Sequence, residues 1–194
     1  MEDAPDRARA WKTLSSQVVF SHRYFPTVME DTVELPTGEV QVWLRYRDER
    51  DGTPRRSSVA AIVVGHDGRL VLARQYCHGP QRVIHEFPGG TVEPGESLAE
   101  GVAREVAEEL GLRSRTVKAL GEFLLDNRRS SATMTVFECR DLEPSDETAH
   151  DSGLIEFEWV SDSELTERIR AGEITNATLL ASWAIYKARQ DSSL

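Results

Sequence analysis

The sequence predicts a mixed α/β fold, either an α/β sandwich or α+β layering, with a small antiparallel β-appendage at its N-terminus. Segments with the alternating pattern of strands run through most of the chain, and three segments have the periodicity of helices. The strands and helices do not alternate regularly, which argues against a βαβ array. The length of 194 residues suits one ordinary domain with an appendage.

The appendage is predicted from β-branched and aromatic residues that alternate with polar ones. This pattern marks three strands, at residues 18–20, 23–34 and 39–46. A Pro-Thr-Gly turn signal separates the last two strands. The polar segment 47–56 contains Gly and Pro and precedes an abrupt apolar run. We therefore expect an appendage at residues 1–56 and the main domain at residues 57–194.

The predicted sheet of the main domain begins with two apolar strands that flank a His-Asp-Gly hairpin signal. These two strands and the later ones are predicted at residues 58–64, 69–76, 117–125, 134–139 and 155–160. Helical periodicity marks residues 97–110, 163–170 and 178–188. The sequence contains no internal repeat that would indicate a solenoid or a propeller.

The helix at residues 97–110 has the clearest boundaries in the chain. Ser97 and Glu100 have the spacing of a capping box, and Gly111 stands where a helix favours a left-handed residue at its C-terminus. Its apolar residues recur every four positions, at Leu98, Val102, Val106 and Leu110. We expect this stripe to pack against the sheet.

Composition excludes several classes of protein. The formal net charge of −10 opposes binding to a nucleic-acid backbone. Two cysteines, Cys77 and Cys139, are too few for a disulfide scaffold and favour a reducing compartment. No uncharged apolar run approaches the ~20 residues that span a bilayer. We expect a globular cytoplasmic protein that binds neither nucleic acid nor membrane.

Carboxylates are unusually dense around the central helix. Residues 86–112 contain seven acids and a single base, Arg104. At 100° per residue, Glu105, Glu108 and Glu109 fall in one arc beside the apolar stripe. Like charges at this spacing repel, and a bound divalent cation reverses the sign of that interaction. Oxygen ligands without His or Cys favour Mg²⁺ or Mn²⁺. The alternative is a solvated acidic helix face.

The segment GGTVEPGESLAEGVAREVAEELGL decides between these readings, because it resembles the Nudix box at its defining positions. The resemblance implies an α/β/α sandwich and hydrolysis of a nucleoside diphosphate linked to another group. It implies that Glu105, Glu108 and Glu109 bind the metal together with the carbonyl of Gly90. It also implies that two further residues orient these ligands, Glu96 and Arg104.

Residues outside the box resemble the ADP-ribose pyrophosphatase branch of that family. The N-terminal β-appendage, the RQY sequence that begins at Arg74 and the EFPGG sequence that begins at Glu86 carry this resemblance. It implies a homodimer in which the appendage exchanges between subunits and helps to form the substrate pocket. For Arg74 a contact to phosphate or ribose competes with a surface position at a strand edge. For Glu86 the position before a Pro-Gly-Gly turn favours a partner or ligand.

Two features depart from the pattern of that branch. The loop at residues 121–131 has no proline, and Arg128 and Arg129 stand there instead, able to bind a phosphate or a sugar or to form a surface turn. The catalytic base is the second departure, because the segment 144–156 has no DE-x-E pattern. Candidates for the base are Glu147, Asp151 and His150, and the alternative for each is a solvated loop residue.

The leading functional hypothesis is Mg²⁺-dependent hydrolysis of ADP-ribose to AMP and ribose 5-phosphate. Another nucleotide sugar, a GDP- or UDP-sugar, is the close variant. A non-catalytic sensor of ADP-ribose is the competing class, although the box is complete here. A hydrolase of oxidised nucleotides is the third hypothesis, and such a protein would usually lack the appendage.

Overall fold

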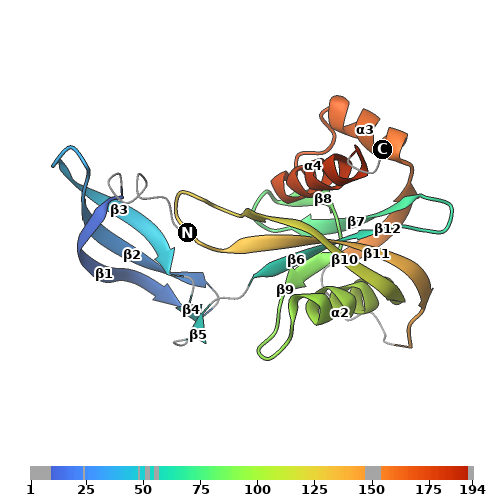
Figure 1. Cartoon of the computed structure of the whole chain (residues 1–194), viewed down its shortest axis with the longest axis horizontal. Helices are drawn as coiled ribbons and strands as arrows, with labels where there is room; N and C mark the ends of the chain where they lie inside the picture. Colours follow the sequence, from blue (N-terminus) through green and yellow to red (C-terminus); the bar gives the residue numbers. More distant parts are fainter. Residues whose placement is uncertain are drawn as a thin grey trace. The chain divides into compact units, whose positions relative to one another are not determined.

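The computed structural model describes residues 10–23, 25–47, 49–50, 53–54, 57–146 and 154–191 (Figure 1). The chain divides into two compact units. The N-terminal unit consists of Met1–Arg55 and Leu124–Ala132, and the main unit consists of Arg56–Phe123 and Thr133–Leu194. The loop at residues 124–132 therefore belongs to the N-terminal unit, although it is far from the rest of that unit in the sequence.

The N-terminal unit contains an antiparallel sheet in the order β1-β2-β3. The strands are β1 (Lys12–His22), β2 (Phe25–Glu34) and β3 (Val40–Arg47), and a short hairpin of β4 (Glu49–Arg50) and β5 (Thr53–Pro54) follows. Strand β1 begins six residues before the predicted strand. The first residues of β1 are polar, so no apolar alternation predicts a strand there. Gln17 Nε2 nevertheless donates to Glu30 Oε1 at 2.8 Å, and Ser16 donates a hydrogen bond to Asp31 across the sheet. Cross-strand hydrogen bonds therefore extend the strand.

The main unit contains two sheets, in the orders β10-β11-β6-β9 and β12-β7-β8. Strand β6 pairs in parallel with β11 and antiparallel with β9, which lies at the edge of its sheet. The strands are β6 (Ser58–Val63), β7 (Leu70–Cys77), β8 (Arg82–Glu86), β9 (Gly89–Thr91), β10 (Leu112–Leu124), β11 (Thr133–Pro144) and β12 (Leu154–Val160). The short strand β9 has no counterpart in the sequence prediction, because its Gly-Gly-Thr sequence reads as a turn.

Helices cover the strands of the main unit from two sides, with α2 (Leu98–Leu110) on one and α3 (Asp162–Arg170) and α4 (Ala177–Asp191) on the other (Figure 1). The predicted capping box of α2 is present, with Ser97 and Glu100 each bonded to the other's backbone. Gly111 ends the helix with φ 63°, in the left-handed region that glycine enters without strain. The predicted α/β/α sandwich and the antiparallel N-terminal sheet are confirmed.

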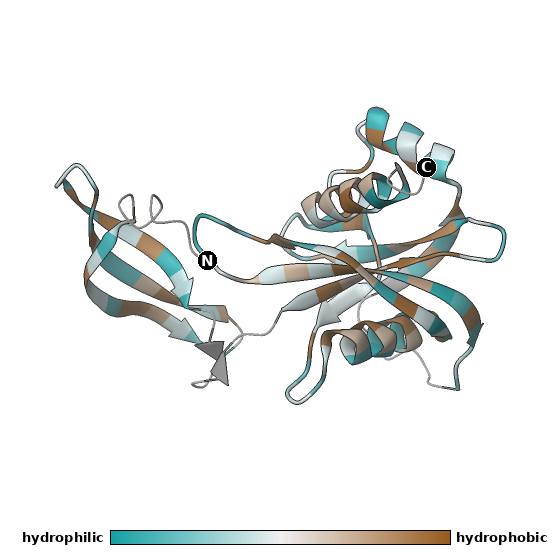
Figure 2. Cartoon of the chain, in the orientation of Figure 1, coloured by the Kyte–Doolittle hydropathy of each residue, from teal (hydrophilic) through white to brown (hydrophobic). Residues whose placement is uncertain are grey.

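Strand β6 divides the core, because its alternate residues face opposite layers. Ile62 packs in a cluster with residues of α3 and α4, including Leu165 and Leu179. Val59, Ala61 and Val63 pack in a second cluster with the apolar stripe of α2. Both α2 and α4 carry brown and teal residues in Figure 2, as amphipathic helices do. Within the described residues, none of the helices combines the length and apolar character of a membrane span.

Candidate active site

Arg104 on α2 connects the carboxylates that the sequence singled out. Its Nη1 donates to Glu105 Oε1 at 3.0 Å and to Glu108 Oε2 at 2.9 Å. Its Nε donates to Glu96 Oε1 at 3.0 Å, and its Nη2 donates to the carbonyl of Thr91 at 3.1 Å. The guanidinium thus fixes two carboxylates of the helix against the loop that follows β9.

This network stabilises the charged forms of its members. The hydrogen bond from Arg104 holds the pKa of Glu96 below its usual value. Burial disfavours the charged guanidinium of Arg104, but its hydrogen bonds to Glu96 and Glu105 and the charge of Glu105 outweigh burial and raise its pKa. Arg104 therefore stays cationic and orients its acidic partners at any physiological pH.

Strand β9 lies so close to its neighbours, α2 at Gly90 and β6 at Gly89, that glycine is required at both positions. A Cβ atom on Gly90 would lie 2.4 Å from Glu105 Oε1, and one on Gly89 would lie 2.1 Å from the carbonyl oxygen of Val59. The backbone N–H of Gly89 donates to Glu109 Oε2 at 3.1 Å. The Gly-Gly sequence thus brings backbone and two carboxylates together at the edge of the sheet.

Two of these carboxylates are poorly suited to carry charge without a counterion. Glu109 is only 9% exposed, and burial together with the charge of Glu105 raises its pKa to about 7. Burial also raises the pKa of Glu105, against the lowering effect of Arg104. Negative potential is therefore concentrated where Glu105 and Glu109 meet β9.

Glu86, at the end of β8, is a half-buried carboxyl group near this cluster. Burial raises its pKa, and Asn176 Nδ2 donates to its Oε2 at 3.2 Å. The sequence analysis missed Asn176, which precedes α4 and caps it by accepting hydrogen bonds from the N–H groups of Thr178 and Leu179. An Asn two residues before the predicted helix at residues 178–188 is the signal that could have identified it.

The other predicted residues do not join this hydrogen-bond network in the described part of the chain. Arg74 forms an ion pair with Glu156 between β7 and β12. Arg128 and Arg129 lie in the N-terminal unit, where their carbonyl oxygens accept hydrogen bonds from Trp43 Nε1 at 3.2 Å and from the N–H of Tyr46 at 2.6 Å. Three candidates for the base lie outside the described residues: Glu147, His150 and Asp151.

The donor set fits a hard divalent cation. The carboxylates of Glu105 and Glu109 lie beside the backbone of β9, and that of Glu108 shares Arg104 with Glu105. These are oxygen donors, without sulfur or imidazole. Across the residues that the structure describes, no group of three or more acidic, His or Cys side chains is already arranged around one point. Arg104 explains this, because its Nη1 holds the oxygens of Glu105 and Glu108. Arg104 engages only one oxygen of each of these two carboxylates, Glu105 Oε1 and Glu108 Oε2.

The α/β/α sandwich places a helix with a carboxylate cluster beside the Gly-Gly sequence of β9. Comparison with family models shows which class of protein has this arrangement. The sequence model described as NUDIX domain matches residues 54–181, and the chain belongs to this family. It is a Nudix hydrolase. It is 34% identical over 129 residues to a "MutT-like protein" of Streptomyces ambofaciens. The aligned segment covers 66% of this chain and 79% of that protein.

Two similar proteins are named ADP-ribose pyrophosphatase. The one from Bacillus subtilis is 26% identical over 155 residues, covering 80% of this chain and 78% of the relative. The one from Mycobacterium tuberculosis is 25% identical over 174 residues, covering 88% and 80%. A crystal structure of an ADP compounds hydrolase superposes with a TM-score of 0.79 at 22% identity, covering 94% of this chain and 95% of that one. That likeness confirms the fold, including its N-terminal sheet.

Proposed function

We propose that the protein hydrolyses the diphosphate bond of a nucleoside diphosphate sugar, with ADP-ribose as the first candidate and AMP and ribose 5-phosphate as the products. The proposal rests on one observation: the carboxylates of Glu105 and Glu109 lie against the Gly89-Gly90 backbone of β9. Relatives named ADP-ribose pyrophosphatase support the choice of substrate.

The residues of α2 would hold Mg²⁺ through the carboxylates of Glu105, Glu108 and Glu109, together with the carbonyl of Gly90. When bound, the ion would neutralise the diphosphate and lower the pKa of a water molecule for in-line attack at phosphorus. Arg104 would keep the carboxylates of Glu105 and Glu108 in place, and Glu96 would in turn position the guanidinium. Glu147 and Asp151 remain predictions for the catalytic base.

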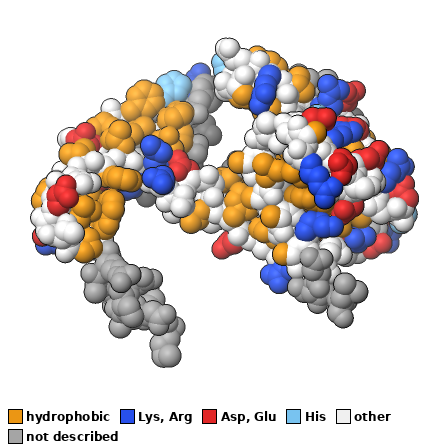
Figure 3. Space-filling model, turned by 90° about the horizontal axis from the view of Figure 1, so that it is seen from above, with side chains coloured by type: hydrophobic (Ala, Val, Ile, Leu, Met, Phe, Trp, Pro, Cys, Tyr) orange, Lys and Arg blue, Asp and Glu red, His pale blue; other side chains and the backbone are white. Residues whose placement is uncertain are grey.

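A homodimer through the N-terminal sheet is part of the proposal. Val40, Val42 and Leu44 alternate along β3, so their side chains share one face, and they are 55%, 60% and 48% exposed in the single chain. Hydrophobic side chains are also prominent over this unit, at the left of Figure 3. An exposed apolar face of this kind is typical of an interface. The cytoplasmic location and the substrate contacts of Arg74, Arg128 and Arg129 remain predictions.

A second candidate is a hydrolase of another nucleotide sugar, such as a GDP- or UDP-sugar. The loop at residues 121–131, which carries two arginines and no proline, favours it because loops of this kind select substrates. The acidic cluster on α2 would serve both substrates, since only the diphosphate contacts it. The two candidates therefore differ in specificity and share their chemistry.

A substrate panel with Mg²⁺ tests the proposal. The panel compares ADP-ribose, GDP-mannose, UDP-glucose, diadenosine polyphosphates and deoxynucleoside triphosphates at equal concentrations, with hydrolysis measured by chromatography. The proposal expects the highest kcat/KM for ADP-ribose. A higher value for GDP-mannose or UDP-glucose would select the second candidate. Binding of ADP-ribose without turnover of any compound would favour a sensor.

A further inference from the structure

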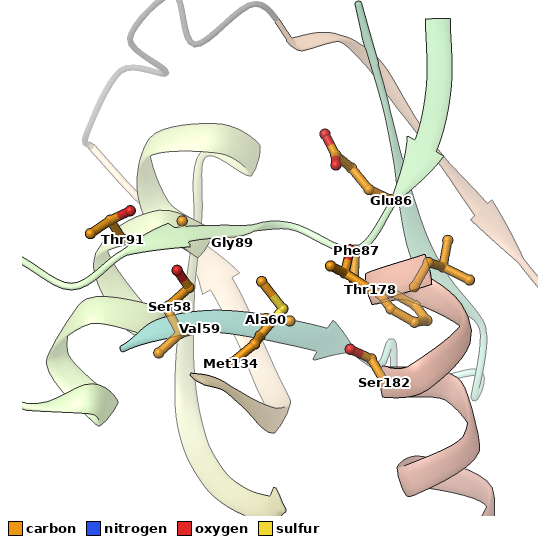
Figure 4. Close-up of a pocket in the computed structure, with 12 residues that line it drawn as sticks. Ser58, Val59, Ala60, Glu86, Phe87, Gly89, Thr91, Met134, Thr178 and Ser182 are labelled. Carbon is orange, nitrogen blue, oxygen red and sulfur yellow. The ribbon is translucent and has the colours of Figure 1, made fainter. Parts of the chain in front are cut away.

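A cavity of about 120 Å³ lies between β6, β9 and the first turns of α4 (Figure 4). Its wall includes Ser58 and Ala60 of β6, Met134 of β11 and Glu86 with Phe87 before β9. Ser182 of α4 completes it, and in Figure 4 its hydroxyl points away from the helix axis toward Ala60 and Met134. All of these residues belong to the main unit.

The hydroxyl of Ser182 is the unusual feature of this cavity. Ser182 is fully buried, and its Oγ is one of three buried side-chain atoms in the described residues that have no hydrogen-bond partner. A serine within a helix can donate to the carbonyl four residues earlier, but Ser182 makes no such bond. Buried polar groups without partners are costly and rare in folded proteins. The hydroxyl therefore lacks the partner that its burial calls for.

The lining of the cavity restricts the chemistry of that partner. Its polar side chains are neutral hydroxyl groups and the carboxyl group of Glu86, without a Lys or Arg among them. A phosphate would meet no cation there and would be repelled by Glu86. A neutral group with several hydroxyls could donate to Glu86 and exchange hydrogen bonds with Ser182. The cavity is also much smaller than the ~300–1,000 Å³ that encloses a whole ligand, so it suits one terminal group.

The cavity and the acidic cluster of α2 share strand β9. Gly89 and Gly90 of β9 line the cavity, and these two residues also meet Glu109 and Glu105. Asn176, at the start of α4, orients the carboxyl group of Glu86 in its wall. A substrate whose diphosphate lay at the acidic cluster could therefore place the adjoining sugar in the cavity.

We propose that this cavity binds the terminal sugar of the substrate and that Ser182 is a residue that determines specificity for its hydroxyl groups. The inference rests on the proposed function, because it assumes a nucleotide-sugar substrate. Ser182 contacts the sugar and not the phosphorus at which the bond breaks. Its removal should therefore weaken binding and leave the chemical step largely intact.

Calorimetric binding to the full chain in EDTA tests this inference without turnover. The variants are Ser182→Ala, which removes the hydroxyl, and Ser182→Val, which also fills part of the cavity. Thr135→Val is the matched control, because Thr135 Oγ1 is likewise buried and without a partner but does not line the cavity. The ligands are ADP-ribose, ribose 5-phosphate and AMP, since only the first two contain the terminal sugar.

Ser182→Ala is expected to raise the Kd for ADP-ribose and ribose 5-phosphate by about three- to tenfold, as loss of one neutral hydrogen bond does. Ser182→Val should raise it further, while the Kd for AMP stays unchanged. With Mg²⁺, KM for ADP-ribose should rise by a similar factor at constant kcat. Ser182→Ala and Thr135→Val should each have a Tm equal to or higher than that of the wild type, because each removes a buried hydroxyl without a partner.

The inference is overturned if Ser182→Ala binds all three ligands with the same Kd values as Thr135→Val. It is also overturned if Ser182→Ala raises the Kd for AMP and leaves the Kd for ribose 5-phosphate unchanged. Failure of the proposed function gives a different result, namely that the wild type hydrolyses no nucleotide sugar with Mg²⁺. In that case a loss of ribose 5-phosphate binding in Ser182→Ala would still assign the cavity to a sugar. An active wild type with unaltered binding in both Ser182 variants would remove the sugar assignment alone.

Discussion

Glu109 Oε2 accepts a hydrogen bond from the backbone N–H of Gly89 at 3.1 Å, which joins the last turn of α2 to the start of β9. This contact holds a buried carboxyl group against the backbone at which the box sequence begins. Its single N–H donor does not offset burial and the neighbouring negative charges, so the pKa of Glu109 rises to about 7. The metal-free site thus carries electrostatic strain that a cation would relieve.

The pH dependence of stability follows from that raised pKa. The pKa of Glu109 is about 7 in the folded protein, against 4.5 for a free glutamate side chain. Folding favours the protonated carboxyl of Glu109, so the associated stability is fully present below pH 4.5 and is lost as the pH rises through about 7. Glu109→Gln should unfold with a free energy higher than the wild type by up to about 3 kcal/mol above pH 7 and by little at pH 4. Urea unfolding of both proteins in EDTA measures this, and a difference independent of pH would contradict it.

Mg²⁺ should stabilise the folded protein, because it neutralises carboxylates that repel one another. At a free concentration ten times its Kd, the expected gain is about 1.4 kcal/mol, seen as a higher Tm that EDTA reverses. The affinity should increase as the pH rises through about 7, since the cation displaces the proton of Glu109. A Tm that does not respond to Mg²⁺ at pH 8 would argue against a metal site on α2.

Arg104→Gln should destabilise the metal-free protein, because Glu96 and Glu105 lose the charged donor that they share. The expected loss is about 1–3 kcal/mol by urea unfolding, since both carboxylates are largely buried. Arg170→Gln removes an exposed ion pair with Glu167 and should change stability by less than about 0.5 kcal/mol. Equal effects of the two substitutions would show that Arg104 does not organise the cluster.

The apolar face of β3 should govern the oligomeric state. Val42 is 60% exposed on this face, so Val42→Arg should convert the dimer to a monomer in sedimentation experiments. Gln41→Arg adds the same charge to the opposite face of the strand and is the control. A wild type that is monomeric at micromolar concentration would refute the dimer, and a dimeric Val42→Arg would move the interface elsewhere.

The sequence predicts most of the fold because local signals and burial agree there. The stripe from Leu98 to Leu110 and the cap at Ser97 predict α2 with its bounds nearly intact. The start of β1 is missed because polar residues form it, and only cross-strand partners such as Asp31 reveal it. Strand β9 is missed because its glycines serve close approach, which no periodicity encodes.

Part of the candidate site can be predicted from the sequence for a similar reason. Three glutamates on one turn of α2 are neighbours by helical geometry alone. The support of Glu86 by Asn176 joins residues that are 90 positions apart, and the cavity at Ser182 forms only when α4 packs beside β6 and β9. Such relationships depend on tertiary packing, so residue spacing in the chain cannot show them.

Hydrolysis of ADP-ribose by the wild type and by Glu109→Gln tests the central claim most directly. Both proteins are assayed with Mg²⁺ at pH 8, AMP and ribose 5-phosphate are separated by chromatography, and Glu167→Gln on the exposed surface of α3 is the control. We predict Mg²⁺-dependent formation of both products by the wild type and the control, and a loss of at least about 100-fold in Glu109→Gln with its fold retained. Undiminished turnover by Glu109→Gln would contradict the assignment of this carboxylate cluster as the active site.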